Sequence, residues 1–264
     1  MTEKQVLERQ IVKLGNSAGV VLPREWLNGR AKIQLVEKPL DIKSDVFNIL
    51  SQYLEEAIGI YLVGSYARGE QTNKSDVDVL VITDKTNKKI NVGKYHLILI
   101  TQKSIEDVLM INVMPILPMI MEAKPLLNSS WIKRYREAKI TKRNLRWHLE
   151  IIKSGLKLIK LSMSLGKELE RSCSDSTAYS LILHLRSIYI VDCLKKKRLW
   201  GNREFLKLIK EISGSLRAYD GYLRVKNDNK ILMDGLPLQE AEKLYDYISK
   251  KIKEQEKWLK AKKE

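Results

Sequence analysis

Two aspartates stand one residue apart at the start of an apolar run, and no other feature of the chain constrains its fold so closely. The run "DVDVLVIT" begins at Asp76 and follows the polar segment "GSYARGEQTNKS", which itself follows the apolar run "IYLV". Side chains two residues apart in a strand lie on the same face. We therefore predict that Asp76 and Asp78 project together while the intervening valines pack into a core.

Two neighbouring carboxylates raise each other's pKa unless a cation lies between them. Oxygen ligands at this spacing suit Mg²⁺, which also accepts oxygens from the phosphates of a nucleotide. Asp76 and Asp78 are therefore candidate metal ligands and catalytic residues.

The polar segment before the aspartates has the residues expected of a phosphate-binding turn. Gly64 lets the backbone approach an anion, and Ser65 offers a hydroxyl and an amide at the start of a helical turn. Arg68 lies one turn further on and can donate a forked pair of hydrogen bonds. Gly69 permits a chain reversal, and Ser75 is expected to cap the loop or to bond a phosphate.

Together, "GS", "RG" and "SDVDVLV" resemble the nucleotidyltransferase superfamily of the DNA polymerase β and kanamycin nucleotidyltransferase type. The stretch "GSYARGEQTNKSDVD" is similar to the minimal prokaryotic nucleotidyltransferases, and the likeness covers roughly residues 45–130. The resemblance implies that Asp76 and Asp78 hold Mg²⁺ or Mn²⁺ and that Gly64 and Ser65 hold the β- and γ-phosphates. It also implies an NTP substrate, with ATP expected, and transfer of NMP with loss of pyrophosphate.

The chain departs from the family pattern at a third carboxylate, which family enzymes carry on the neighbouring strand. That strand reads "YHLILIT", and no Asp or Glu occurs between Asp84 and Glu106. His96 fits the register best. It is either a metal ligand or base, better suited to Zn²⁺ or Mn²⁺ than to Mg²⁺, or a residue without a catalytic part. Glu70 is an outside candidate that is expected to face solvent.

The first 43 residues predict a β-hairpin element of a different kind. Strands are expected around the turn "NSAG", followed by a helical turn ending at Gly29 and a strand over 31–37. The stretch from Lys13 to Leu35 resembles the swapped-hairpin fold of the AbrB and MazE type. That resemblance implies a homodimer and DNA binding through basic residues, which here are Arg9, Lys13, Arg24, Arg30 and Lys32. The alternative is a strand element used only for dimerisation or packing.

Beyond these segments the apolar spacing is helical, so the fold class is predicted as α+β. A small mixed-sheet nucleotidyltransferase domain (44–130) is followed by a basic α-helical domain (131–264), with the hairpin element (1–43) in front. Ser44 is expected to cap a helix over 45–59, and Ser174 or Asp175 a central helix. His148 and His184 are expected to be structural residues within helices.

Charge is distributed unevenly along the chain. Residues 131–264 hold 32 Lys and Arg against 17 Asp and Glu, so they carry +15 of the net charge of +16. Such a surface favours a polyanionic partner, with RNA as one candidate. A solvated, lysine-rich helical surface is the equally weighted alternative.

Composition excludes several classes of protein. No apolar run approaches the roughly 20 residues of a membrane span, and the first ten residues lack the apolar stretch of a signal peptide. Two cysteines rule out a disulfide framework or a four-cysteine zinc site. We therefore expect a cytoplasmic protein with no membrane partner.

The sequence leaves two functional hypotheses. The first is a metal-dependent enzyme that moves NMP from an NTP to a protein hydroxyl, an RNA end or a small molecule. The second is a catalytically degenerate nucleotide-binding regulator, or an antitoxin-like DNA-binding protein, in which the missing third carboxylate marks a sensor.

Overall fold

The computed structural model describes residues 6–36, 40–73, 75–114, 116–228 and 235–261. The chain divides into two units, Met1–Asp41 and Ile42–Glu264. The larger unit carries the aspartate pair.

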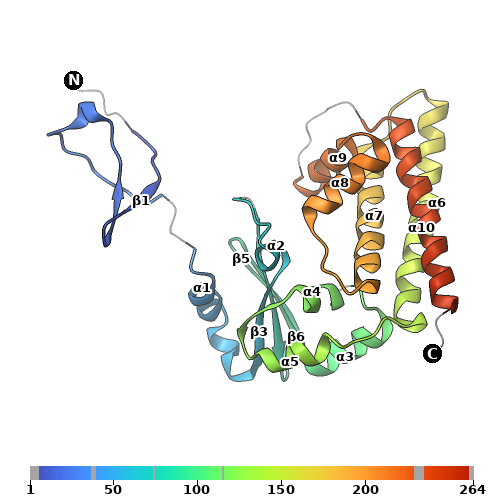
Figure 1. Cartoon of the computed structure of the whole chain (residues 1–264), viewed down its shortest axis with the longest axis horizontal. Coiled ribbons are helices and arrows are strands. Elements are labelled where there is room, and N and C mark those ends of the chain that lie inside the picture. The colour runs from blue at the N-terminus through green and yellow to red at the C-terminus, as the bar shows by residue number, and fades with distance from the viewer. Residues whose placement is uncertain (1–5, 37–39, 74, 115, 229–234, 262–264) are drawn as a thin grey trace. The chain divides into compact units, whose positions relative to one another are not determined.

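A five-stranded mixed sheet forms the base of the larger unit (Figure 1). Its strand order is β5-β6-β4-β3-β7, with β4 and β6 parallel and the other neighbouring pairs antiparallel. The central strands are apolar on both faces, as expected of strands covered by helices on each side. The strands are β3 (Ala57–Val63), β4 (Val77–Thr83), β5 (Lys88–Val92), β6 (Tyr95–Thr101) and β7 (Lys124–Leu127).

The three strands predicted from apolar runs, β3, β4 and β6, are confirmed. The two remaining strands were not predicted. β5 lies in a segment that reads as a polar turn, and β7 follows a proline-interrupted helical pattern. Both lie at the edges of the sheet, where few of their residues are covered, so they lack the apolar alternation that marks a strand.

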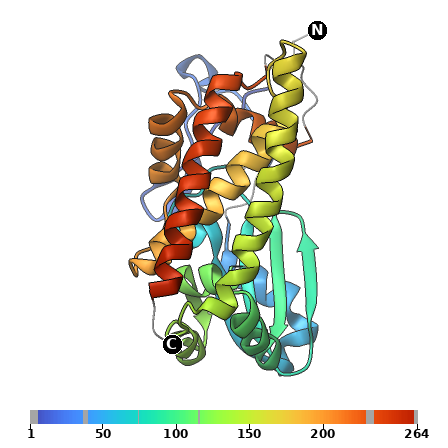
Figure 2. The ribbon, with the colours of Figure 1, turned by 90° about the vertical axis from the view of Figure 1, so that its right-hand side faces the viewer.

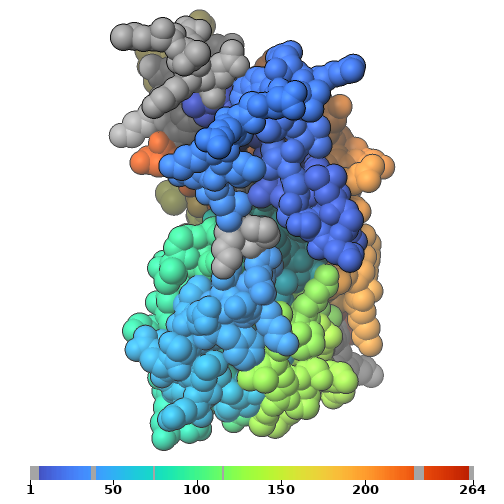
Figure 3. Space-filling view, turned by 90° about the vertical axis from the view of Figure 1, so that its left-hand side faces the viewer, coloured from blue at the N-terminus to red at the C-terminus, as the bar shows by residue number. Residues whose placement is uncertain are grey.

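Several helices pack around the sheet, and the helices from residue 142 onwards form a helical layer beside it (Figure 1). The single helix predicted after Ser44 is wrong: the chain forms α1, then a 3₁₀ segment η2 (Ser51–Glu56), and enters β3 at Ala57. In Figure 3, α1 and η2 (light blue) lie at the surface beside the yellow-green β7–α5 region. The helices are α1 (Ile42–Ile49), α2 (Gly64–Arg68), α3 (Gln102–Ile111), α4 (Leu117–Glu122), α5 (Ser129–Tyr135), α6 (Lys142–Glu168), α7 (Asp175–Lys195), α8 (Asn202–Ser213), α9 (Arg217–Lys226) and α10 (Leu238–Ala261).

One continuous hydrophobic core joins the sheet to the helical layer. It runs from Leu80 in β4 through Ile120 in α4 to Leu181 in α7. α7 is apolar on nearly all sides and packs among α6, α9 and α10, which confirms its predicted central place (Figures 1 and 2). Its predicted cap is also confirmed, because the Ser174 side chain accepts a hydrogen bond from the Thr177 amide. The predicted division of this unit at residue 130 stays a prediction.

The smaller unit is a two-stranded hairpin with a 3₁₀ turn. β1 (Ile11–Leu14) pairs antiparallel with β2 (Ser17–Val20), and η1 spans Arg24–Trp26. Gly15, at φ 58°, opens the two-residue connection, so the turn comes earlier than "NSAG" predicts. The strand predicted over 31–37 is wrong for the described residues 31–36, which form no ladder.

Nothing in the described part of this smaller unit is buried. Its apolar side chains are therefore exposed, although they are numerous enough to form a small core. The exposed apolar residues are Val6, Leu7, Ile11, Val12, Leu14, Val21, Leu22, Leu27, Ile33, Leu35 and Val36. Val20, Pro23 and Trp26 are only partly covered, so apolar burial within this unit does little to offset its conformational entropy.

No helix within the described ranges is long and apolar enough to cross a membrane.

The buried histidine of α6 makes the larger unit sensitive to acid. His148 is 5% exposed, and its Nε2 atom has no hydrogen-bond partner. Burial, and secondarily the nearby His184, lower the pKa of His148 from its ordinary 6.5 to about 4. Between pH 6.5 and about 4, His148 therefore binds a proton in the unfolded chain but stays neutral in the folded chain. The contribution of neutral His148 to the unfolding free energy is fully present above pH 6.5. It is lost as the pH falls from 6.5 towards 4.

We expect His148 to account for about 3 kcal/mol of unfolding free energy lost between neutral pH and the lower limit of this window. Urea unfolding at about pH 7.5 and about pH 4.5 measures the loss. The His148→Leu variant should lose less stability than the wild type over the same interval. Equal losses in both proteins would show that other groups control acid unfolding.

Candidate active site

The aspartate pair and His96 come together at one end of β4 and β6. Asp78 lies beside His96 in the parallel register, and Asp76 immediately precedes β4. The Nδ1 atom of His96 lies 4.0 Å from Asp76 Oδ2 and 3.9 Å from Asp78 Oδ1. The register predicted for His96 is therefore confirmed, and its ring nitrogen faces both carboxylates.

The carboxylate of Asp78 is partly buried and lies close to a like charge. Burial raises its pKa, and the like charge of Asp76 raises it further. His96, Lys226 and Arg68 act in the opposite direction. About two-fifths of the Asp78 side chain, 42%, remains exposed, so solvent moderates these effects. A cation bound between the two carboxylates would relieve their repulsion, so it would be stabilised more than at a single aspartate.

Glycine is the only residue type that fits at position 64, beside Asp78. It has φ 71°, and a Cβ atom built on it would lie 2.3 Å from Asp78 Oδ2. Val63, one residue earlier, pairs with Asp78 across β3 and β4. The first turn of α2 is therefore pressed against the aspartate strand with no side chain between them.

A buried carboxylate that the sequence did not reveal holds this turn in place. Glu122 ends α4 and is 7% exposed. Its Oε1 accepts a hydrogen bond of 2.7 Å from the Gly64 amide, and its Oε2 lies 2.5 Å from Nη1 of Arg68. Burial raises the pKa of Glu122, whereas Arg68 and the Gly64 amide lower it. An isolated acid within the apolar stretch "MPILPMIMEA" was the available signal, since a buried acid needs a partner.

Arg68 and Glu70 extend this network to the helical layer. The Nε atom of Arg68 bonds Glu70 Oε2 at 2.8 Å, and Glu70 Oε1 accepts a 2.7 Å hydrogen bond from the Asn202 amide at the start of α8. The expectation that Glu70 faces solvent is wrong, because its side chain is only 23% exposed. Arg68 is held by two carboxylates, and its predicted contact with a phosphate stays a prediction.

The remaining residues of the predicted turn have local roles. Ser65 is the second residue of α2, directly after Gly64. Gly69 ends α2 in the left-handed conformation, with φ 74°. The hydroxyl of Ser75 accepts a 2.8 Å hydrogen bond from the Thr72 amide, so the loop-capping alternative is the one observed.

Basic residues of the helical layer also act on the site. Lys226, at the end of α9, lowers the pKa of Asp78, and Arg186 of α7 lowers that of Glu122. Arg186 and Arg68 line the same small hollow, together with Trp200 and Asn202. Sequence patterning could not assign these cations to the site, because their position depends on how the helices pack.

The carboxylates of Asp76 and Asp78 have the chemistry of a divalent-cation site. Two carboxylates on one strand face provide the oxygen ligands that Mg²⁺ and Mn²⁺ prefer. Among the residues that the structure describes, no group of three or more His, Cys, Asp or Glu side chains is arranged to hold a metal ion by itself. The site therefore fits a cation that takes its remaining ligands from water or from a nucleotide's phosphates.

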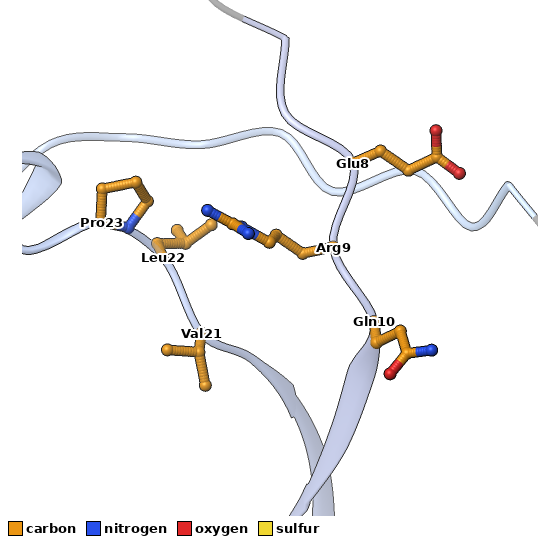
Figure 4. Close-up of a pocket in the computed structure, with 6 residues that line it drawn as sticks. All are labelled: Glu8, Arg9, Gln10, Val21, Leu22 and Pro23. Atoms are coloured by element: carbon orange, nitrogen blue, oxygen red, sulfur yellow. The ribbon is translucent and has the colours of Figure 1, made fainter.

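The smaller unit has a hollow of its own, lined by Glu8, Arg9, Gln10, Val21, Leu22 and Pro23. Figure 4 shows Arg9 directed across it towards Leu22, while Glu8 points away. The basic residues predicted to bind DNA are exposed along this unit, and they are Arg9, Lys13, Arg24, Arg30 and Lys32.

Residues 43–143 match the family model described as "Nucleotidyltransferase domain". This part of the chain is therefore similar to nucleotidyltransferase domains. It includes the aspartate pair, His96, the Gly64 turn and Glu122. The match begins after the smaller unit, so the resemblance of that unit to the AbrB type is not supported by it.

Two solved structures resemble the chain. A nucleotidyltransferase-like protein from Exiguobacterium sibiricum 255-15 is 15% identical, with a TM-score of 0.38 over 81% of this chain and 75% of that chain. The spectinomycin adenyltransferase AAD(9) from Enterococcus faecialis, solved with ATP and spectinomycin, is 13% identical, with a TM-score of 0.41 over 80% of this chain and 97% of that chain. No curated protein matches the chain.

The close approach of Gly64 to Asp78 predicts a selective effect of substitution. Gly64→Ala should lose about 1–2 kcal/mol through the positive φ alone, and more because the new methyl group meets Asp78. Gly214→Ala is the matched control, since Gly214 also has a positive φ, of 93°, but open space around it. Urea unfolding of both variants measures the difference. Equal losses would mean that the contact with Asp78 does not constrain position 64.

Proposed function

We propose that the larger unit is a metal-dependent nucleotidyltransferase that moves NMP from an NTP, with ATP expected, to an acceptor hydroxyl. One observation carries this proposal: the paired carboxylates of Asp76 and Asp78 face His96 on one side and meet the Gly64 turn on the other. The family match over residues 43–143 supports the same reaction class.

Asp76 and Asp78 are assigned the metal and the catalytic role. A divalent cation bound there would neutralise charge on the triphosphate as the acceptor attacks the α-phosphorus and pyrophosphate leaves. His96 is assigned the role of an additional ligand or of the base that takes the acceptor proton; the distances of 4.0 and 3.9 Å from its Nδ1 to the two carboxylates support this proposal. We assign it this role in place of the third carboxylate.

The anion grip is assigned chiefly to Ser65. The Gly64 amide already donates to Glu122, so the amide and hydroxyl of Ser65 are the donors left to receive phosphate oxygens. Gly64 contributes close approach, and Gly69 the chain reversal. Arg68 is assigned a supporting role, because Glu122 and Glu70 engage its guanidinium. Ser75 caps the loop that leads to Asp76.

The acceptor stays open among a protein hydroxyl, an RNA end and a small molecule. Residues 131–264 carry nearly all the excess positive charge, and Arg186 and Lys226 extend it to the site. This charge supports an anionic acceptor or partner, RNA included. The rival proposal is a nucleotide-binding regulator that lacks transfer activity because β6 carries His96, and not a carboxylate, in register with Asp78.

Transfer of label from α-labelled ATP, CTP, GTP or UTP tests the enzyme against the regulator. We expect transfer in Mn²⁺ or Mg²⁺ when candidate acceptors or cell extract are supplied. Asp76→Asn and Asp78→Asn should each reduce it at least about 1,000-fold, because several kcal/mol of charge stabilisation depend on the cation. Asp84→Asn, an exposed aspartate beyond the end of β4, should leave transfer unchanged. Nucleotide binding without transfer in the wild type would favour the regulator.

We propose a second role for the smaller unit, as a paired DNA-binding element. The observation that favours it is that no described residue of this unit is buried, so a second copy of the same hairpin is a natural cover for its apolar side chains. Its five exposed basic residues would then be repeated on both copies, within reach of a duplex backbone.

A duplex-DNA gel shift with salt titration tests this role. Arg24→Ala should reduce the magnitude of the salt slope by about 1, the signature of one lost phosphate contact. Ile33→Asp removes no cation, and Ile33 is 68% exposed in the single chain. It should nevertheless weaken binding about 10-fold if pairing is required. Lys85→Ala in the larger unit is the control. Unchanged binding by Ile33→Asp, or an effect of Lys85→Ala equal to that of Arg24→Ala, would contradict the proposal.

A further inference from the structure

α6 has a second apolar face, separate from the one that joins the hydrophobic core. The core-facing side chains include Leu145, Leu149 and Ile152. A second row runs along the solvent side of the same helix. Its members are Trp147, Ile151, Leu158, Leu161 and Leu165, which are 55%, 48%, 69%, 59% and 50% exposed. We refer to these five residues as the α6 stripe.

The spacing of the α6 stripe is that of a coiled-coil seam. With Ser154 included, the positions alternate by four and three residues from 147 to 165, which is the a/d pattern of a heptad repeat. The core-facing residues occupy other positions of the same heptads. Charged residues, among them Arg146, Glu150 and Lys157, border the stripe. The face therefore has the apolar centre and polar rim of a protein–protein contact.

Within the described ranges, the α6 stripe is left exposed by every element of the unit. Figure 2 shows α6 (yellow-green) running along the front of the helical layer, with its length open to the viewer. Exposed single leucines are common on soluble proteins, but an aligned row on one helix is not. The row is too regular to be incidental.

We propose that the α6 stripe is a self-association surface, occupied by the α6 stripe of a second copy of this chain. A heptad seam is self-complementary, so two identical copies related by a twofold axis satisfy each other with the same residues. Each copy would insert Leu158 and Leu161 between residues of the other. No different partner sequence is needed.

The area of the α6 stripe indicates a weak, reversible dimer. From Trp147 to Leu165 the helix spans about 27 Å, and with the following turn to Leu169, which is 61% exposed, about 33 Å. A helix face of that length and about 10 Å wide presents roughly 330 Å² on each copy, or about 660 Å² in total. This is below the range for stable protein–protein interfaces and typical of weak, transient contacts, so we expect association only at tens of micromolar and above.

Sedimentation of the full chain tests the proposal. We expect Leu158→Glu and Leu165→Glu each to halve the sedimenting mass at tens of micromolar, whatever association the smaller unit contributes. Leu199→Glu is the matched control, because Leu199 is an exposed leucine, 53% accessible, outside α6. It should leave the mass unchanged. Circular dichroism and urea unfolding should be the same for all four proteins, since these side chains contribute nothing to the core of one chain.

Three outcomes would overturn the proposal. A wild type that sediments as a monomer at this concentration has no such contact. Stripe variants that keep the wild-type mass place the association elsewhere. Binding of the wild type to anionic phosphatidylserine vesicles that Leu158→Glu abolishes, with no change in mass, would assign the α6 stripe to a membrane surface instead. If one stripe variant misfolds by circular dichroism, the other still decides the question.

Discussion

The hydrogen bond from the Gly64 amide to the buried carboxylate of Glu122 is the contact on which the site depends. A buried carboxylate is costly unless it is paired, and here the amide and Arg68 together provide the partners. In return, Glu122 holds the turn after β3 in a conformation that a residue with a side chain would resist. That conformation brings the start of α2 against Asp78. Removing either partner would leave the other buried and unsatisfied, so the two sides of the site are fixed together.

The same network links the nucleotide-facing turn to the helical layer. Arg68 bonds Glu122 and also Glu70, and Glu70 accepts the amide of Asn202 at the start of α8. A change in the position of the turn therefore acts on the first turn of α8 through two charged side chains. Lys226 and Arg186, on other helices of this layer, add positive charge towards the carboxylates. The helical layer is thus part of the electrostatics of the site as well as a cover for the sheet.

Local alternation was enough to predict the aspartates, His96 and the three central strands. Each of these follows from which residues must be buried, and the parallel register of β4 and β6 then places His96 beside Asp78. Long-range partners were not accessible in this way. Glu122 lies 58 residues from Gly64, and nothing local indicates the pairing. The edge strands were missed because a strand covered on few sides needs no apolar pattern.

The strand predicted over 31–37 is wrong for a different physical reason. Its sequence has strand character, but within one chain the described residues there have no neighbouring strand to pair with. Propensity predicts what a segment does when a partner is present, and it does not supply the partner. The apolar residues of the smaller unit are likewise exposed in the single chain, where no second surface covers them.

The two uncovered apolar surfaces of the protein differ in what their partners must do. The smaller unit buries none of its described residues, so under the proposed pairing its folding and its association would be one equilibrium with one concentration dependence. The α6 stripe, by contrast, lies on a helix whose opposite face is already packed in a large core. The proposed association through the α6 stripe would add to a unit that is already folded. Under the two proposals, loss of the α6 contact would leave the carboxylate site in place and unchanged, whereas loss of the hairpin's partner would also unfold the hairpin.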